Sequence, residues 1–273
     1  MPLADRYDGL LIDLDGVVWI GREPVPGSPR ALEALLEAGK RLVFVTNNPS
    51  RHPSVYAERL RELGIPASEG QIVTAGMVVA RLAGEAAGPG GSAFVIGGAA
   101  LKEMTAATGA RLLEGEPARE ADVVVVSGHR RFDYEELLTA KLALDRGAAL
   151  LATSHDPTMP MPGGDWPGTG AVLAAVEIAS GQGAVIAGKP ERHLFEMAIA
   201  ALGRSFSLSG NEEEQLDGRV AMVGDRISSD IEGGRRAGLE TVLVLSGSTS
   251  RAEAEAAAPP PDHVLEDLAG LVR

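Results

Sequence analysis

The chain has 273 residues, 45% of them hydrophobic, and carries 25 Lys and Arg against 38 Asp and Glu, a formal net charge of −13. This length and apolar content favour one large or two medium folded domains over a disordered chain. The absence of cysteine excludes disulfides, thiolate metal ligands and thiol nucleophiles, and makes the cytoplasm the default location. The net negative charge disfavours a nucleic-acid partner. The sequence shows no signal-peptide pattern and no apolar run long enough to span a bilayer, so we expect no membrane partner.

Short continuous apolar runs alternate along the chain with longer amphipathic stretches, which is typical of strands buried on both faces and separated by helices. The predicted strands lie near residues 9–14, 41–45, 92–96, 122–127, 148–152, 184–187, 219–223 and 241–245. The predicted helices lie near residues 28–39, 52–63, 75–86, 99–108, 133–146, 170–181, 191–202 and 228–237. The alternation predicts an α/β fold with a parallel sheet.

Two glycine-rich breaks suggest how the chain is divided. Residues 84–92 contain four glycines and a proline, and residues 180–183 read Ser-Gly-Gln-Gly. Such segments are typical of domain boundaries. We therefore predict an inserted domain over residues 87–183 and a core built from residues 1–86 and 184–273.

The first candidate site follows the first predicted strand directly, in the sequence Asp13-Leu14-Asp15-Gly16. The two carboxylates project from the carboxyl end of a buried strand, where open α/β sheets usually bind ligands. By itself the motif is weak, because an Asp-Gly turn that ends a strand has the same pattern.

Two further strand ends carry polar groups. Thr46, Asn47 and Asn48 follow the second predicted strand. Lys189, one of only four lysines in the chain, lies between Gly188 and Pro190, directly after the strand predicted near residues 184–187. An ordinary turn and a surface lysine are the simpler explanations. The functional interpretation is that the ammonium neutralises a phosphate oxygen and a nearby carboxylate.

The fourth strand end is Asp225, with Asp230 in the first turn of the next helix. Asp230 taken by itself can be explained as a favourable negative charge at the start of a helix. If Asp225 faces Asp13 and Asp15, however, the repulsion among the three carboxylates is costly unless a cation lies among them. Oxygen ligands without cysteine or clustered histidine favour Mg²⁺. Together the four strand ends supply what metal-assisted phosphoryl transfer requires: a nucleophile, a proton donor, oxygen contacts and charge neutralisation.

The full set of motifs resembles the haloacid dehalogenase-like (HAD) hydrolases, in particular subclass IIA, typified by NagD and the p-nitrophenyl phosphatases. The motifs that carry the resemblance are Asp13-Leu-Asp-Gly-Val-Val, Thr46-Asn-Asn, Pro167-Gly-Thr-Gly-Ala171, Gly188-Lys-Pro190 and Val223-Gly-Asp-Arg-Ile-Ser-Ser-Asp230. The resemblance covers essentially the whole chain. It implies a Rossmann-like, doubly wound core with an inserted α/β cap domain of the C2 type, which often forms a homodimer interface.

The resemblance also implies roles for individual residues. Asp13 would be the nucleophile that forms an aspartyl-phosphate, and Asp15 the general acid and then base. Thr46 and Lys189 would hold the phosphate. The implied metal ligands are Asp13, the backbone carbonyl of Asp15, Asp225 and Asp230. The further candidate substrate contacts in the core motifs are Gly16, Asn47 and Asn48.

The expected cap loop offers candidates for substrate selection. We single out His155, Asp156 and Met159, which lie on a polar, irregular stretch of the kind that often carries recognition. Asp156 and Asp165 would accept hydrogen bonds from hydroxyl groups and repel a second anionic group. The sequence therefore favours a polyol or sugar phosphate, such as glycerol phosphate, as the small phosphorylated metabolite. Phosphoglycolate, pyridoxal phosphate and nucleoside monophosphates are the alternatives.

Two other classes of protein share part of this pattern. Phosphoacceptor receiver domains also combine strand-end acids, a threonine and a Lys-Pro pair with Mg²⁺. They carry these groups in a different order and in a much shorter chain, which disfavours that interpretation. A phosphometabolite-binding protein without catalytic activity stays open.

Overall fold

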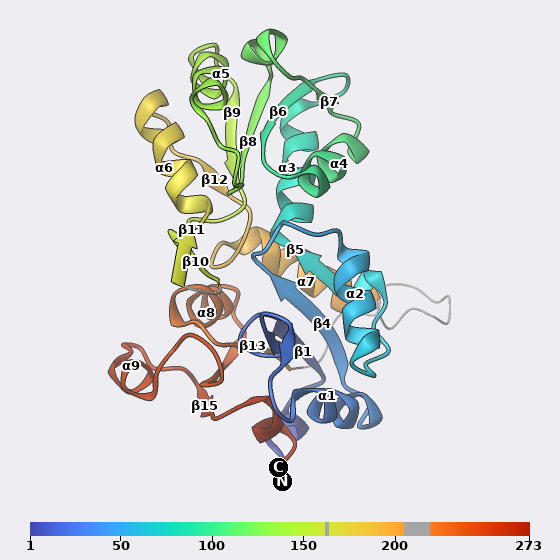
Figure 1. Ribbon diagram of the computed structural model, residues 1–273. Coiled ribbons are helices and arrows are strands. Elements are labelled where there is room, and N and C mark those ends of the chain that lie inside the picture. Colours follow the sequence, from blue (N-terminus) through green and yellow to red (C-terminus); the bar gives the residue numbers. More distant parts are fainter. Residues whose placement is uncertain (162–163, 205–218) are drawn as a thin grey trace. The chain divides into compact units, whose positions relative to one another are not determined.

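The computed structural model describes residues 1–161, 164–204 and 219–273, and the chain divides into two compact units (Figure 1). The first unit comprises Met1–Thr46, Pro53–Val73 and Lys189–Arg273, and the second comprises Asn47–His52 and Thr74–Gly188. Each unit contains its own sheet and its own buried core. We describe them separately.

The sheet of the first unit has β1 (Gly9–Asp13) near its centre, between β13 (Val220–Gly224) and β4 (Arg41–Thr46). β14 (Glu240–Val244) and β15 (His263–Leu265) continue it beyond β13, and β5 (Ile72–Thr74) lies beyond β4. The pairs from β15 to β4 are parallel. All residues of β1 are buried, as expected for a strand covered on both faces. The carboxyl ends of β1, β4 and β13 therefore meet at one edge.

Helices cover both faces of this sheet. On one face lie α1 (Ser28–Glu37) and α2 (Pro53–Glu62), whose Leu32 and Leu60 belong to one buried cluster with Leu10 and Phe44. On the other face lie α7 (Arg192–Arg204) and α8 (Glu232–Arg236). A π-helical turn, Ile227–Ile231, precedes α8. The result is a three-layer α/β/α arrangement.

The second unit is also a three-layer α/β/α structure. Its parallel sheet has the order β12 (Val185–Ile186), β9 (Ala149–Ala152), β8 (Val123–Val126), β6 (Ser92–Ile96) and β7 (Arg111–Leu112). One face is covered by α3 (Ala75–Ala87) and α4 (Ala99–Ala107), the other by α5 (Tyr134–Asp145) and α6 (Thr169–Ser180). An antiparallel hairpin, β10 (Thr158–Met161) with β11 (Gly164–Pro167), stands apart from the sheet.

The remaining elements are short. They are β2 (Trp19–Ile20), β3 (Glu23–Pro24), α9 (Arg251–Ala256) and the 3-10 turns Leu3–Arg6, Glu69–Gln71, Glu116–Glu120 and Leu268–Leu271.

Each predicted strand and helix has a counterpart in the structure, and the predicted α/β fold is confirmed. The helix predicted at 228–237 begins instead with the π-helical turn. The short strands β2, β3, β5, β7, β10, β11 and β15 are not foreseen, because two to four residues carry too little periodicity.

The predicted insert and the second unit differ at α3 and also at residues 47–52 and 184–188, which the structure groups with the second unit. The prediction places residues 75–86 in the core, whereas the structure groups them with the second unit. The reason is packing: α3 lies against β8, β9 and α4, and its residues Val78, Val79 and Ala83 are buried. The glycine-rich segment that suggested a boundary is the connection from α3 to β6 within one unit.

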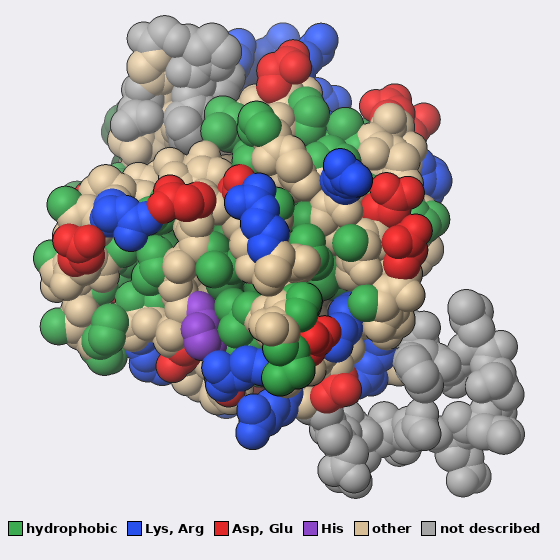
Figure 2. Space-filling model, turned by 90° about the horizontal axis from the view of Figure 1, so that it is seen from below, with side chains coloured by type: hydrophobic (Ala, Val, Ile, Leu, Met, Phe, Trp, Pro, Cys, Tyr) green, Lys and Arg blue, Asp and Glu red, His purple; other side chains and the backbone are tan. Residues whose placement is uncertain are grey.

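The surface visible in Figure 2 carries acidic and basic side chains interspersed with scattered hydrophobic ones. Among the helices in the described parts of the chain, none combines the length and the apolar character needed to span a bilayer.

Candidate active site

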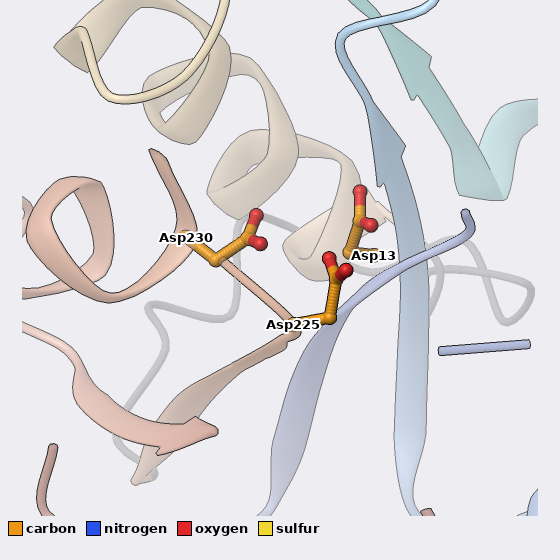
Figure 3. Close-up of side chains that lie close together, drawn as sticks. All are labelled: Asp13, Asp225 and Asp230. Carbon is orange, nitrogen blue, oxygen red and sulfur yellow. The ribbon is translucent and has the colours of Figure 1, made fainter. Parts of the chain in front are cut away.

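Three aspartates from neighbouring segments point their carboxylates toward one another at the carboxyl edge of the first unit's sheet (Figure 3). Asp13 is the last residue of β1, Asp225 follows β13, and Asp230 lies in the π-helical turn. The register pairs Ile12 with Val223, so the strand ends of Asp13 and Asp225 are adjacent. One oxygen from each carboxylate lies within 4.8 Å of the others, and all three residues are buried. The structure thus brings together three of the predicted metal ligands.

Lys189 lies between two of these carboxylates. Its Nζ donates to Oδ1 of Asp13 at 2.5 Å and to Oδ1 of Asp230 at 2.6 Å, and the residue is 4% exposed. Burial by itself lowers the pKa of this ammonium, but attraction by Asp13 and Asp230 outweighs it and raises the pKa above its usual value. Lys189 is therefore a buried ammonium paired with two carboxylates, not a surface lysine.

The donor set fits a hard divalent cation. Burial raises the pKa of Asp13. The Lys189 ammonium opposes this rise, whereas the negative charges of Asp230 and Asp225 raise the pKa further. One ammonium thus leaves the three carboxylates with a surplus of negative charge, which a bound cation would compensate. The converging groups are all carboxylate oxygens, the ligand type that Mg²⁺ prefers. We conclude that the residues present fit Mg²⁺.

Two glycines allow the Asp225 carboxylate to sit where it does. A Cβ on Gly16 would lie 2.4 Å from Oδ2 of Asp225, and a Cβ on Gly247 would lie 2.1 Å from the same oxygen. Oδ2 of Asp225 also accepts a hydrogen bond of 2.6 Å from the backbone N–H of Ser248. Gly247 and Ser248 follow β14 and were not predicted; the Ser-Gly-Ser sequence after this strand is the signal that was available.

The substitution Gly247→Ala is expected to weaken Mg²⁺ binding by about 10- to 100-fold, the usual cost of disturbing the groups that orient a metal ligand. The added methyl group overlaps Oδ2 of Asp225 and must displace it. Isothermal titration calorimetry with Mg²⁺ measures the effect. Gly70→Ala is the matched control, because its Cβ meets no atom closer than 4.0 Å. Equal Mg²⁺ affinities for the two variants would contradict the expectation.

The other predicted catalytic residues also lie at this edge. Thr46 ends β4, beside β1, and is 2% exposed. Asp15 is exposed, and its Oδ1 accepts a hydrogen bond of 3.0 Å from the indole Nε1–H of Trp19. Gly16 has a φ of +87°, and its N–H donates to the carbonyl of Trp19 at 2.7 Å. The predicted substrate contact at Gly16 therefore has its backbone N–H engaged within the protein.

The other predicted substrate contacts belong to the second unit. The amide Nδ2 of Asn47 donates to Oδ2 of Asp156 at 3.2 Å, and Oδ1 of Asn48 accepts from the backbone N–H of Ser50 at 3.0 Å. His155 is exposed, and Met159 on β10 is 39% exposed. The side chain of Asp165 lies outside the described residues. Asn48 thus makes the ordinary turn interaction that is the simpler explanation of its motif.

Three converging carboxylates and a buried lysine at a sheet edge are groups that metal-assisted phosphoryl transfer requires, and comparison with known proteins identifies the family. The family model of haloacid dehalogenase-like hydrolases matches residues 10–111, and a HAD-hydrolase-like model matches residues 186–271. The chain belongs to the haloacid dehalogenase-like hydrolases, and the predicted resemblance is confirmed.

Individual relatives cover nearly the whole chain. The glycerol-3-phosphate phosphatase of Gallus gallus is 36% identical over 98% of this chain and 91% of its own length. The crystal structure of the glycerol phosphate phosphatase of Mycobacterium tuberculosis in complex with magnesium has a TM-score of 0.86 at 35% identity, over 99% of this chain and 78% of that one. The structure of the p-nitrophenyl phosphatase from Archaeoglobus fulgidus has a TM-score of 0.85 at 31% identity, over 97% of this chain and 98% of that one.

Proposed function

We propose that this chain is a Mg²⁺-dependent phosphatase that hydrolyses small phosphate monoesters through an aspartyl-phosphate, with glycerol phosphate as its substrate. The observation that carries the proposal is the buried cluster of Asp13, Asp225 and Asp230 around Lys189. Membership of the haloacid dehalogenase-like hydrolases supports the reaction class. Relatives named glycerol phosphate phosphatases, one of them solved with magnesium, support the substrate and the metal.

In the first half of the reaction, a carboxylate oxygen of Asp13 attacks phosphorus opposite the ester oxygen. The bond between phosphorus and the ester oxygen breaks, and its electron pair stays on that oxygen, which takes a proton from the carboxyl group of Asp15. The products are an alcohol and a phosphoryl group bonded to Asp13. Lys189 stabilises the charge that develops on the transferred group, and the Thr46 hydroxyl donates to its oxygens.

In the second half, Asp15, now a carboxylate, takes a proton from water, and the hydroxide oxygen attacks phosphorus. The bond between phosphorus and Asp13 breaks, and its electrons return to the Asp13 carboxylate. Inorganic phosphate leaves. The groups that would hold Mg²⁺ are Asp13, the backbone carbonyl of Asp15, Asp225 and Asp230, and the bound ion would supply further charge neutralisation at the phosphate oxygens.

The test is phosphate release from a panel of esters, with Mg²⁺ and with a chelator. The panel comprises glycerol phosphate, p-nitrophenyl phosphate, phosphoglycolate, pyridoxal phosphate, sugar phosphates and nucleoside monophosphates. We expect release that requires Mg²⁺, because without it the carboxylate surplus repels the phosphate, and the highest kcat/KM for glycerol phosphate. A higher kcat/KM for another ester would replace the proposed substrate. Binding of these esters without release would identify a non-catalytic phosphometabolite-binding protein instead.

Three expectations from the sequence stay predictions. The second unit is proposed as the cap domain, and His155, Asp156 and Met159 as its substrate contacts. A homodimer formed through that unit is expected and is measured by light scattering. A cytoplasmic location is expected and is measured by fractionation.

A further inference from the structure

The aromatic side chain of Trp19 forms a hydrogen bond with a predicted catalytic group, the carboxylate of Asp15. Its indole Nε1–H donates to Oδ1 of Asp15 at 3.0 Å, and Trp19 itself is fully buried. The backbone holds the two residues in this register. The N–H of Trp19 donates to the carbonyl of Leu14 at 3.2 Å, and the carbonyl of Trp19 accepts from Gly16 at 2.7 Å.

Arg59 fixes the indole ring from α2. Its guanidinium carbon lies 4.0 Å from the centroid of the Trp19 ring, a cation–π contact. The same guanidinium donates to the carbonyl of Gly21 at 2.6 Å, which is in the turn between β2 and β3. The Trp19 ring therefore lies between the core and an anchored cation, and its N–H has one fixed direction.

We propose that Trp19 is a positioning residue for the acid–base group, whose indole N–H reserves Oδ1 of Asp15 as an acceptor and so leaves Oδ2 to carry and transfer the proton. The proposal rests on the proposed function, because it needs Asp15 to act as acid and base.

The hydrogen-bonding chemistry of the indole and the carboxyl group assigns different roles to the two oxygens of Asp15. An indole N–H only donates hydrogen bonds, so the carboxyl oxygen that faces it must accept. When Asp15 is protonated, the proton is therefore on Oδ2. In the first half-reaction the Oδ2–H bond breaks, its electron pair stays on Asp15, and the proton moves to the departing ester oxygen. Without the N–H the proton has two alternative oxygens, and the carboxyl group is free to rotate.

The test compares Trp19→Phe with the wild type on two esters that need the acid to different degrees. The phenyl ring keeps an aromatic face for Arg59 and removes the N–H together with the rest of the five-membered ring. Glycerol phosphate releases an alkoxide that needs a proton, whereas p-nitrophenyl phosphate releases a stable anion. We expect kcat/KM for glycerol phosphate to fall about tenfold more than kcat/KM for p-nitrophenyl phosphate, which is a part of the roughly 10²- to 10⁴-fold that general acid catalysis contributes.

The ratio of the two kcat/KM values separates positioning from damage to the fold, because a general loss of structure lowers both values equally. Asp15→Asn is the reference variant and should change the ratio in the same direction and further. Tyr7→Phe is the matched control, since it also deletes one donor from a buried aromatic ring, the hydroxyl that donates to Glu240 at 2.6 Å. It should leave the ratio unchanged.

An unchanged ratio in Trp19→Phe overturns the proposal, whether or not the two rates fall together. If that variant does not fold, benzothienylalanine at position 19, which replaces the N–H by sulfur, gives the same comparison. Wild-type protein that releases phosphate from neither ester would reject the proposed function and this inference with it. Wild-type activity with an unchanged ratio rejects only the role of Trp19.

Discussion

The substitution Asp13→Asn is expected to lower phosphate release by at least about a thousandfold, the order of loss when a catalytic nucleophile is removed. An amide oxygen does not replace a carboxylate as the nucleophile, although it has nearly the same size. Release is measured on glycerol phosphate with saturating Mg²⁺. In the wild type, rapid acid quenching followed by mass spectrometry should find one phosphoryl group on the peptide that contains Asp13, and none in the variant.

A matched aspartate lies at the other end of the same strand. Asp8 precedes β1, is exposed, and accepts a hydrogen bond of 2.9 Å from the backbone N–H of Arg219. Asp8→Asn makes the same chemical change and should keep nearly full activity. Asp13→Asn should stay folded, because Lys189 keeps its ion pair with Asp230. Substantial activity in a folded Asp13→Asn variant would rule out Asp13 as the nucleophile.

The substitution Lys189→Met is expected to lower both activity and stability. It preserves the length of the side chain but removes the only ammonium that contacts Asp13 and Asp230 within the described part of the chain. Removing one partner of a buried ion pair costs about 3–5 kcal/mol of unfolding free energy, because the remaining charges are left uncompensated. Urea denaturation followed by circular dichroism, in the presence of a chelator, measures this loss. Phosphate release should fall with it.

Mg²⁺ distinguishes the charge effect from a packing effect. Because the cation also compensates the carboxylates, excess Mg²⁺ should reduce the stability difference between Lys189→Met and the wild type. Lys141→Met is the control: Lys141 forms a partly exposed pair with Asp145, and such pairs contribute about 0–1 kcal/mol. A loss of stability in Lys189→Met as small as that of the control would contradict the role of Lys189.

Much of the fold could be predicted because its strands are apolar at every position. The run Val123–Val126 is buried throughout and forms a strand in the middle of the second sheet. The division of the chain was harder to predict. The glycine-rich segment after α3 resembles a linker, yet α3 packs on the sheet that follows it, and only the packing reveals this.

The core of the candidate site was predicted because its groups stand at strand ends. Asp13, Thr46 and Asp225 each end or follow a strand, and parallel strands bring such ends to one edge. The residues that hold them were not predicted. Trp19 and Arg59 carry no motif of their own, and the Ser-Gly-Ser sequence at Gly247 and Ser248 does not indicate what it contacts. The importance of these residues depends on contacts across the tertiary structure.

The sequence alone therefore determined the α/β class, the family, and the residue types of a site for phosphoryl transfer, because periodicity and strand-end motifs are local. Only the tertiary structure decided that Lys189 bridges Asp13 and Asp230, that Gly16 and Gly247 enclose Asp225, and that Trp19 binds one oxygen of Asp15. Such contacts join residues that are far apart in the chain, such as Lys189 and Asp13, which are 176 positions apart. Local patterns do not encode which distant side chains meet, since that depends on how the strands and helices pack.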